Sequence, residues 1–297
     1  MTRIAVVGLG AMGGGMARSC LRDGLTTYGV DMDAARVAAF VGEGGAPEPL
    51  AEIATTLDIV TTVVVNADQT EAALFGETGI ASSLKAGAVI LSCATMAPDR
   101  AKDFAARAAA LDLLYVDSPV SGGTLRAASG DLSFLASGPA AAFDVAAPAL
   151  DAMGREVFRL GEEIGQGSAM KAINQVLVGV HIAAAAEAMT FGMTQGVEPA
   201  QALEIISKCA GTSWAFENRG PHIVEGDYTP LSAVDIWLKD LGIVMDIAKD
   251  AKFSAPLTAA ALQQFVAASG SGLGREDDAA VAKVYARNAG LTLPGGD

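Results

Sequence analysis

Short runs of β-branched and aliphatic residues alternate with longer amphipathic stretches through the first half of the chain. The runs predict strands, at Ile4–Val7, Thr26–Val30, Ile59–Val65, Val89–Leu91, Leu113–Val116, Leu132–Ser137 and Val157–Arg159. The stretches between them predict helices, at Met12–Asp23, Asp33–Val41, Pro98–Leu111 and Pro139–Met153. Strands that alternate with helices build a parallel sheet with helices on both faces. We therefore expect a doubly wound α/β domain.

The second half shows only helical patterns after Gly161. A long apolar helix is expected over residues 166–195, followed by helices at Pro199–Cys209, Ser213–Arg219, Asp235–Lys252, Leu257–Ser269 and Asp278–Asn288. We divide the chain into an α/β domain, residues 1–163, and an all-α domain, residues 164–297, joined by the long helix. Because the later helices are hydrophobic on more than one face, we expect this domain to bury surface in a homodimer or homotetramer.

Charge and composition limit the classes of partner that the protein can bind. The 297 residues include 34 acidic and 20 basic side chains, for a net charge of −14. Such a surface repels phosphate backbones and anionic headgroups, which argues against nucleic acid and membranes as partners. Three scattered cysteines and two histidines argue against a disulfide framework or a metal site. The N-terminus leads directly into a strand, without a signal-peptide pattern, so we expect a cytoplasmic protein.

A glycine pattern, G-x-G-x-x-G, joins the first strand to the first helix. Its six residues are Gly8, Leu9, Gly10, Ala11, Met12 and Gly13. Such glycines permit a tight turn and bring the backbone close to a pyrophosphate at the helix N-terminus. Asp31 follows the second strand, where a carboxylate accepts hydrogen bonds from the adenosine ribose and repels a 2′-phosphate. The pattern predicts a Rossmann-type domain that binds NAD. Arg36 keeps NADP as a less favoured option, and the alternative for Asp31 is a simple helix cap.

Three further segments carry polar and basic residues suited to an acid substrate: Asp117–Gly123, Gly167–Gln175 and Trp237–Leu241. Lys171 and Asn174 are three residues apart, so they project from one face of the long helix. A lysine takes the proton of a hydroxyl as hydride leaves the carbon, provided that its pKa falls from about 10.4 toward neutrality. Burial, a helix N-terminus or a second lysine favours such a fall.

These motifs together resemble the β-hydroxyacid dehydrogenase family, which includes 3-hydroxyisobutyrate dehydrogenases and tartronate semialdehyde reductases. The family motifs correspond to Gly8–Ala17, Asp117–Gly123 (D-x-P-V-S-G-G), Gly167–Asn174 (G-x-x-x-K-x-x-N) and Lys239–Leu241 (K-D-L). The resemblance covers the whole chain. Its nearest branch is that of the L-threonate dehydrogenases, on the segments His181–Met189, Ser213–Arg219 and Gly226–Ile236.

The resemblance implies a dehydrogenase of a small hydroxy acid with Lys171 as the catalytic acid/base. The substrate would be bound by Ser121, Gly122, Gly123, Asn174, Gln175 and Lys239. The cofactor would be contacted by the glycine pattern and by Asp31, Val65, Asn66, Thr95 and Lys239. For Lys239 the alternative is an exposed charged pair with Asp240. His181 lies two helical turns from Asn174 on the same face; a packed, hydrogen-bonded side chain is the favoured interpretation, and contact with the substrate pocket is the alternative.

Two positions depart from the common family pattern. Gln175 follows Asn174 where a second asparagine is usual, and Val65-Asn66 stands where many relatives have Leu-Pro. The polar side chains of Asn66 and Gln175 favour a polyhydroxylated acid, such as a four-carbon aldonate, over a methyl-branched one. The alternatives are a 3-hydroxyisobutyrate dehydrogenase, a tartronate semialdehyde reductase and a non-catalytic dinucleotide-binding module. Imine reductases share the fold but typically lack the lysine at position 171.

Overall fold

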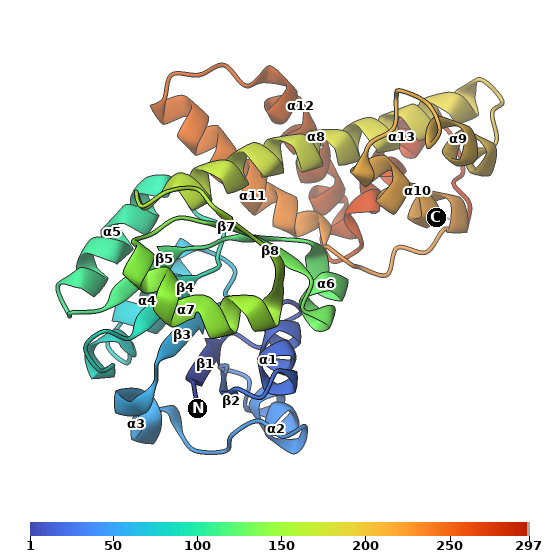
Figure 1. Ribbon diagram of the computed structural model, residues 1–297. Helices are drawn as coiled ribbons and strands as arrows, with labels where there is room; N and C mark the ends of the chain where they lie inside the picture. The colour runs from blue at the N-terminus through green and yellow to red at the C-terminus, as the bar shows by residue number, and fades with distance from the viewer. Residues whose placement is uncertain (296–297) are drawn as a thin grey trace. The chain divides into compact units, whose positions relative to one another are not determined.

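The computed structural model describes residues 1–295 (Figure 1). The chain forms two compact units, one spanning Met1–Lys171 and the other beginning at Ala172. Helix α8 (Gln166–Thr194) starts in the first unit and continues in the second. The expected domain boundary, 163/164, lies just ahead of this helix, whereas the two units divide within its first two turns.

The first unit is built on a parallel sheet of five strands in the order β2-β1-β3-β4-β5. The strands are β1 (Arg3–Val7), β2 (Thr26–Val30), β3 (Ile59–Thr62), β4 (Val89–Ser92) and β5 (Leu114–Asp117). Ile4 pairs with Thr27 on one side and with Ile59 on the other. The chain therefore passes from β2 across β1 to β3, which makes the carboxyl ends of β1 and β3 the point where the winding direction reverses.

Helices cover both faces of this sheet because alternate strand residues point to opposite sides. Ile4 and Val6 belong to a buried cluster shared with α1 and α7, whereas Ala5 and Val7 belong to a second cluster shared with α4 and α5. The helices of this unit are α1 (Gly13–Arg22), α2 (Ala34–Gly42), α3 (Leu50–Ile53), α4 (Ala67–Phe75), α5 (Pro98–Ala109), α6 (Gly123–Ser129) and α7 (Ala140–Met153), with 3-10 turns at Ala54–Thr56 and Ala81–Ser83. The predicted Rossmann-type fold is confirmed.

A smaller sheet of three strands, β6-β7-β8, extends from the end of β5. Its strands are β6 (Val120–Ser121), β7 (Leu132–Ala136) and β8 (Gly154–Arg159). The backbones of Asp117 and Ser137 exchange two hydrogen bonds, of 3.0 and 2.8 Å, that tie β5 to the end of β7. The segment Asp117–Gly123 therefore leaves the large sheet and enters the small one at its carboxyl edge.

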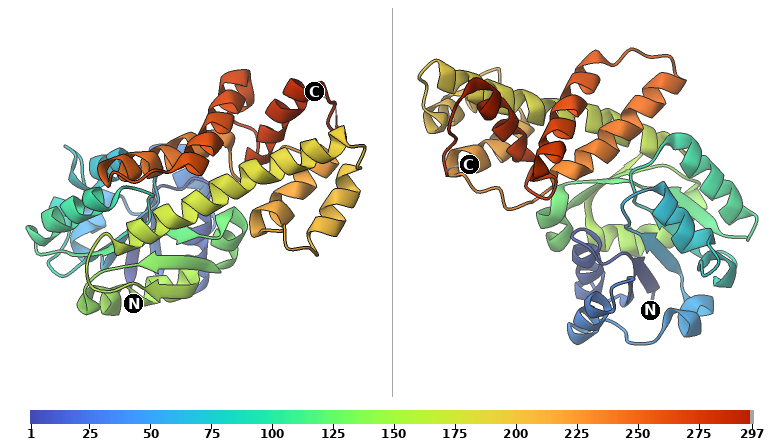
Figure 2. Two further views of the ribbon diagram at one scale, coloured as in Figure 1. Left: turned by 90° about the horizontal axis from the view of Figure 1, so that it is seen from above. Right: turned by 180° about the vertical axis from the view of Figure 1, so that it is seen from behind.

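The second unit is all-helical over the residues that the structure describes (Figure 2). It contains most of α8, then α9 (Pro199–Ile206), α10 (Trp214–Glu225), α11 (Val234–Asp250), α12 (Pro256–Ala268) and α13 (Val281–Ala289), with short turns at Ser269–Leu273 and Asp278–Ala280. Gly179 lets α8 approach α11 closely, since a Cβ there would lie 2.8 Å from a Leu241 methyl carbon. Trp237 stacks on Phe265 in the core, with 5.6 Å between ring centroids.

Helix α8 is long and apolar enough to cross a membrane by length and composition alone. A core helix passes the same test. Ile182, Ala186 and Met189 of α8 are each at most 1% exposed within the hydrophobic cluster of the second unit. These residues place part of α8 in the core of the second unit, so its apolar length does not by itself indicate a membrane span.

The structure corrects several predicted boundaries. Strand β3 ends at Thr62, and residues 63–65 form the loop that the predicted strand included. Helix α10 continues past Pro221 to Glu225, where Gly226 adopts a left-handed conformation (φ 69°) and terminates it. Helices α4 and α6 were not predicted. Helix α6 spans only seven residues, too few turns for a clear periodicity, and α4 has no continuous apolar face, since only Thr70 and Leu74 of its nine residues are buried.

Candidate active site

The glycine loop between β1 and α1 has the three properties that a pyrophosphate cradle needs. A Cβ on Gly8 (φ 98°) would lie 2.4 Å from the carbonyl oxygen of Val63, so only glycine permits this turn. A Cβ on Gly13 would lie 1.8 Å from the Gly8 carbonyl oxygen, so the helix packs tightly on the loop. At Gly10 the nearest such neighbour is 3.9 Å away, the guanidinium of Arg36. The loop is therefore open where a phosphate would approach.

Asp31 connects the end of β2 to this loop. One carboxylate oxygen accepts the N–H of Leu9 at 2.7 Å, and the other accepts the N–H of Asp33 at 2.9 Å. Burial alone would raise the pKa of this carboxyl, but those two N–H groups and the charge of Arg36 hold it below its ordinary value. The cap of α2 is made by Asp33, which accepts the N–H of Ala35. Asp31 is thus an ionised group beside the glycine loop rather than the cap that the alternative suggested.

The other predicted cofactor residues follow neighbouring strands. Val65 and Asn66 follow β3, and Thr95 follows β4, so all three lie at the carboxyl edge of the sheet with the glycine loop. Asn66 also has a structural role, since its side-chain oxygen accepts the N–H of Gln69 at 2.9 Å at the start of α4. Gln69 in turn accepts the N–H of Val65, as in a capping box. The Asn-x-x-Gln capping signal is present in the sequence, although Asn66 was assigned there only to the cofactor and substrate site.

The start of α8 is fixed to the ends of β5 and β7. The buried Asp117 carboxylate accepts both the N–H and the hydroxyl of Ser168, each at 2.7 Å. Gly167 donates its N–H to the Ser137 hydroxyl at 3.1 Å. Burial raises the pKa of Asp117, against the lowering effect of the bonds from Ser168. A carboxylate at a helix N-terminus also faces the positive end of the helix dipole. Sequence analysis did not assign this anchoring role to Asp117 and Ser168.

This anchor places Lys171 beside the predicted substrate loop. The Lys171 side chain is withdrawn from solvent (9% exposed for the residue), and its ammonium donates to the carbonyl oxygen of Val120 at 2.9 Å. Ser121, Gly122 and Gly123 follow directly at the junction of β6 and α6. A Cβ on Gly123 would meet nothing within 4 Å, so its backbone faces open space. Two motifs about fifty residues apart in sequence thus come together, and Lys171 is not a solvated surface lysine.

The remaining predicted residues form a connected polar chain within the second unit. Asn174 donates its side-chain amide to the oxygen of Gln175 at 2.9 Å, and Gln175 donates to the Asp240 carboxylate at 2.5 Å. Lys239 forms an ion pair with the other oxygen of Asp240 at 2.7 Å. Asp240 is 3% exposed, so Lys239 and Asp240 are not the exposed pair that the alternative described.

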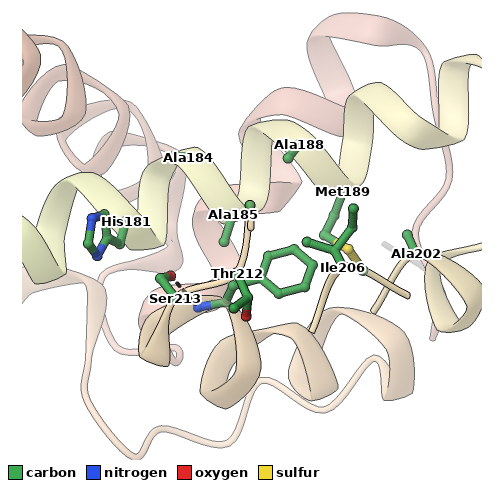
Figure 3. Close-up of a pocket in the computed structure, with 11 residues that line it drawn as sticks. His181, Ala184, Ala185, Ala188, Met189, Ala202, Ile206, Thr212 and Ser213 are labelled. Carbon is green, nitrogen blue, oxygen red and sulfur yellow. Dashed lines mark hydrogen bonds between the residues drawn. The ribbon is translucent and has the colours of Figure 1, made fainter. Parts of the chain in front are cut away.

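The second unit also contains a cavity of about 360 Å³. It is lined mainly by small and apolar side chains of α8, α9 and α10, with His181 at one end and Ala202 at the other (Figure 3). None of the predicted substrate or cofactor residues lines it, so we assign it no catalytic role. Among residues 1–295, no cluster of three or more His, Cys, Asp or Glu side chains is arranged to hold a metal ion.

Comparison with known proteins places this geometry in a family. Residues 3–161 match the NAD binding domain of 6-phosphogluconate dehydrogenase, and residues 165–285 match the family described as NAD-binding of NADP-dependent 3-hydroxyisobutyrate dehydrogenase. The L-threonate dehydrogenase of Cupriavidus necator is 50% identical over 98% of both chains. The chain belongs to the 3-hydroxyisobutyrate dehydrogenase-like family. This confirms the family predicted from the four motifs.

Other members of the family agree with the assignment. The L-threonate dehydrogenase of Escherichia coli K12 is 45% identical over 98% of this chain and 96% of its own. The crystal structure of a 3-hydroxyisobutyrate dehydrogenase from Salmonella typhimurium superimposes with a TM-score of 0.89, at 45% identity, over 96% of this chain and all of that one. As a member of the family, the chain is a hydroxy-acid dehydrogenase that uses a nicotinamide dinucleotide and acts on a small molecule.

Proposed function

We propose that this dehydrogenase oxidises L-threonate or a closely related four-carbon aldonate, with NAD as the hydride acceptor and Lys171 as the acid/base. The observation that carries the proposal is the environment of Lys171. Its amino group is held out of bulk water on the carbonyl oxygen of Val120, which is close in sequence to Gly123, the glycine of the substrate loop whose backbone faces open space. A lysine that only served solubility would lie exposed.

In the proposed reaction, the glycine loop and Asp31 would hold NAD, which would supply a hydride acceptor for the carbon that bears the substrate hydroxyl. Lys171 in its neutral form takes the proton of the substrate hydroxyl, and the resulting ammonium keeps its bond to Val120. In the reverse direction the same ammonium donates to the carbonyl oxygen. Ser121 and the backbone N–H groups of Gly122 and Gly123 bind the substrate carboxylate. Because the chain carries a net charge of −14, attraction for an acid has to come from such local groups.

The choice of a four-carbon aldonate rests on the relatives and on polarity. Curated relatives at 44–50% identity are L-threonate dehydrogenases, whereas the Salmonella structure at 45% bears the name of a 3-hydroxyisobutyrate dehydrogenase. Overall identity therefore does not decide between the two acids. The amides of Asn174 and Gln175, next to Lys171 on α8, favour an acid with several hydroxyl groups. Lys239, on α11, is assigned to substrate or cofactor contact.

The glycine loop, Val65, Asn66 and Thr95 are assigned to the cofactor, and Asp31 favours NAD over NADP. An ionised carboxylate beside the ribose site repels a 2′-phosphate, although Arg36 is close to it. Residues 1–163 then form the NAD-binding domain, and residues 164–297 the substrate and oligomerisation domain. We further assign the protein to the cytoplasm, as a homodimer or homotetramer.

The direct test is reduction of NAD+ and NADP+, followed by absorbance. The substrates are L-threonate, D-erythronate, D-glycerate and 3-hydroxyisobutyrate, each with the wild type and the Lys171→Met variant. Methionine keeps the volume and removes the amine. Lys208→Met is the matched control, since Lys208 is a solvent-exposed lysine paired with Glu204. We expect the Lys171 variant to lose about 10²–10⁴-fold in kcat and the control to retain full activity.

The panel also separates the candidates. A clear preference for 3-hydroxyisobutyrate over L-threonate would replace the aldonate with a methyl-branched substrate. A second assay, oxidation of NADH or NADPH with tartronate semialdehyde, runs beside the panel; efficient reduction there, with weak oxidation of every acid, would favour the reductase. Dinucleotide binding without turnover of any substrate would contradict the proposed catalysis and favour a non-catalytic module.

A further inference from the structure

Asp240 forms the end of a hydrogen-bonded chain that reaches the predicted substrate-binding amide. The order is Asp240, Gln175, Asn174, with donor–acceptor distances of 2.5 and 2.9 Å. Gln175 is 6% exposed and Asp240 is 3% exposed, so water does not compete for the bond between them as it does at the surface, and the bond from the half-buried Asn174 is partly shielded. Asp240 belongs to α11 and the two amides to α8, so this series of hydrogen bonds links two helices of the second unit.

The direction of the chain follows from the chemistry of its end group. Asp240 is paired with Lys239, and an ionised carboxylate only accepts hydrogen bonds. The end of the Gln175 amide that faces Asp240 must therefore be its NH₂ group, which turns its oxygen toward Asn174. Asn174 must then use its NH₂ group on Gln175. Its own carbonyl oxygen, Oδ1, occupies the other branch of the amide and points away from Gln175.

We infer that Asp240 and Gln175 are positioning residues that set the amide orientation of Asn174, so that Asn174 presents an acceptor oxygen to a donor hydroxyl of the substrate. The inference rests on the proposed function, because it takes Asn174 as a substrate contact. Lys171 and Asn174 lie on one face of α8. Lys171 handles the reacting hydroxyl, and Asn174 selects acids that carry a further hydroxyl. A methyl-branched acid offers no hydrogen-bond donor for this oxygen.

This arrangement assigns Gln175 a role distinct from direct contact. Its amide has a partner at each end within the protein, Asn174 and Asp240, so it transmits orientation rather than meeting the substrate. A second asparagine at position 175 would be one methylene shorter. The longer side chain of Gln175 therefore reaches from α8 to Asp240.

The test compares substrates within each variant. The ratio of kcat/KM for L-threonate to that for each turned-over mono-deoxy analogue, among 2,3-, 2,4- and 3,4-dihydroxybutanoate, measures recognition of one hydroxyl. The analogue that lacks the reacting hydroxyl is not oxidised and serves as the inert control. Gln175→Met keeps the side-chain length but removes the relay. We expect the ratio to fall about tenfold, the worth of one hydrogen bond. Effects on folding or on Lys171 change both acids alike and cancel in the ratio.

A rescue variant separates orientation from simple loss of packing. In the double variant Asn174→Asp/Gln175→Met, both oxygens of residue 174 are acceptors, so no relay is needed to orient them. We expect the ratio to return to within about threefold of the wild type, even if the added charge weakens binding of both acids. An unchanged ratio in Gln175→Met, or a double variant no better than Gln175→Met, would overturn the relay.

Two further measurements distinguish failure of the relay from failure of the proposed function. Asn174→Ala should lower the ratio as much as Gln175→Met. If it does not, Asn174 does not contact that hydroxyl, and the proposed role of Asn174 as a substrate contact fails. If the wild type oxidises none of these acids, the relay is tested without substrate, by a double-mutant cycle of Gln175→Met and Asp240→Asn in urea unfolding. Coupling between the two supports the buried bond, and additive effects overturn it.

Discussion

At the residue scale, the Asp31 carboxylate accepts the N–H groups of Leu9 and Asp33 and lies 3.5 Å from the guanidinium of Arg36. We predict that Asp31→Ser lowers the ratio of kcat/KM for NAD+ over NADP+ by roughly tenfold to a hundredfold. The variant removes one negative charge near the expected 2′-phosphate position and releases Arg36 to pair with it. Steady-state kinetics with both cofactors measure the ratio.

Asp33→Ser is the matched control at this scale. It removes another carboxylate that lies 3.5 Å from Arg36, but one that caps α2. The control should keep the preference for NAD, since serine also serves as a helix cap. An Asp31→Ser variant whose cofactor ratio equals that of Asp33→Ser would show that Asp31 does not face the ribose.

At the element scale, the first turn of α8 determines where Lys171 lies. A Cβ on Gly167 would come within 2.4 Å of the Leu135 carbonyl oxygen and 2.5 Å of the Asp117 carbonyl oxygen. We predict that Gly167→Ala destabilises the protein by about 1–3 kcal/mol in urea unfolding, because the helix start must move away from both strands. Since the shift also displaces Lys171, kcat should fall in the protein that remains folded.

Gly192→Ala tests the same substitution near the other end of this helix. There the added methyl group would meet only the Val197 side chain, at 3.8 Å. Alanine is the better helix former, so this variant should gain up to about 1 kcal/mol without loss of activity. Equal effects of the two substitutions would show that the close packing at Gly167 is not needed.

The helices and strands also differ from the contacts between them in how well the sequence predicts them. Strand and helix patterns placed most elements to within a few residues, and the motifs placed Lys171 on a helix, whereas the short strand β6 that contains Ser121 was not predicted. The partners were not predictable, because Asp117 and Ser168 are 51 residues apart, and Gln175 and Asp240 are 65 apart. Such pairs depend on how strands and helices pack, which no local pattern encodes. Asn66 is the opposite case. Its capping signal is local and present in the sequence, but Asn66 was assigned only a functional role.

At the scale of the whole molecule, both tryptophans, Trp214 and Trp237, lie in the second unit. Their fluorescence therefore reports the unfolding of that unit, whereas circular dichroism reports the helices of both. In the core of the second unit, Asp278 accepts Arg219 Nε at 2.5 Å and the indole N–H of Trp237 at 2.7 Å. Asp278 is fully buried and Arg219 is 6% exposed.

We predict that Asp278→Asn destabilises the second unit by about 3–5 kcal/mol, seen as a lower urea midpoint of the tryptophan fluorescence. The substitution leaves the Arg219 charge buried without its principal counter-ion, and removing one partner of a buried pair costs far more than the pair contributes. Glu204→Gln, which breaks an exposed helical pair with Lys208 in the same unit, should cost only about 0.3–0.5 kcal/mol. If the two variants unfold at the same midpoint, the buried pair does not stabilise this unit, and its core depends on apolar packing alone.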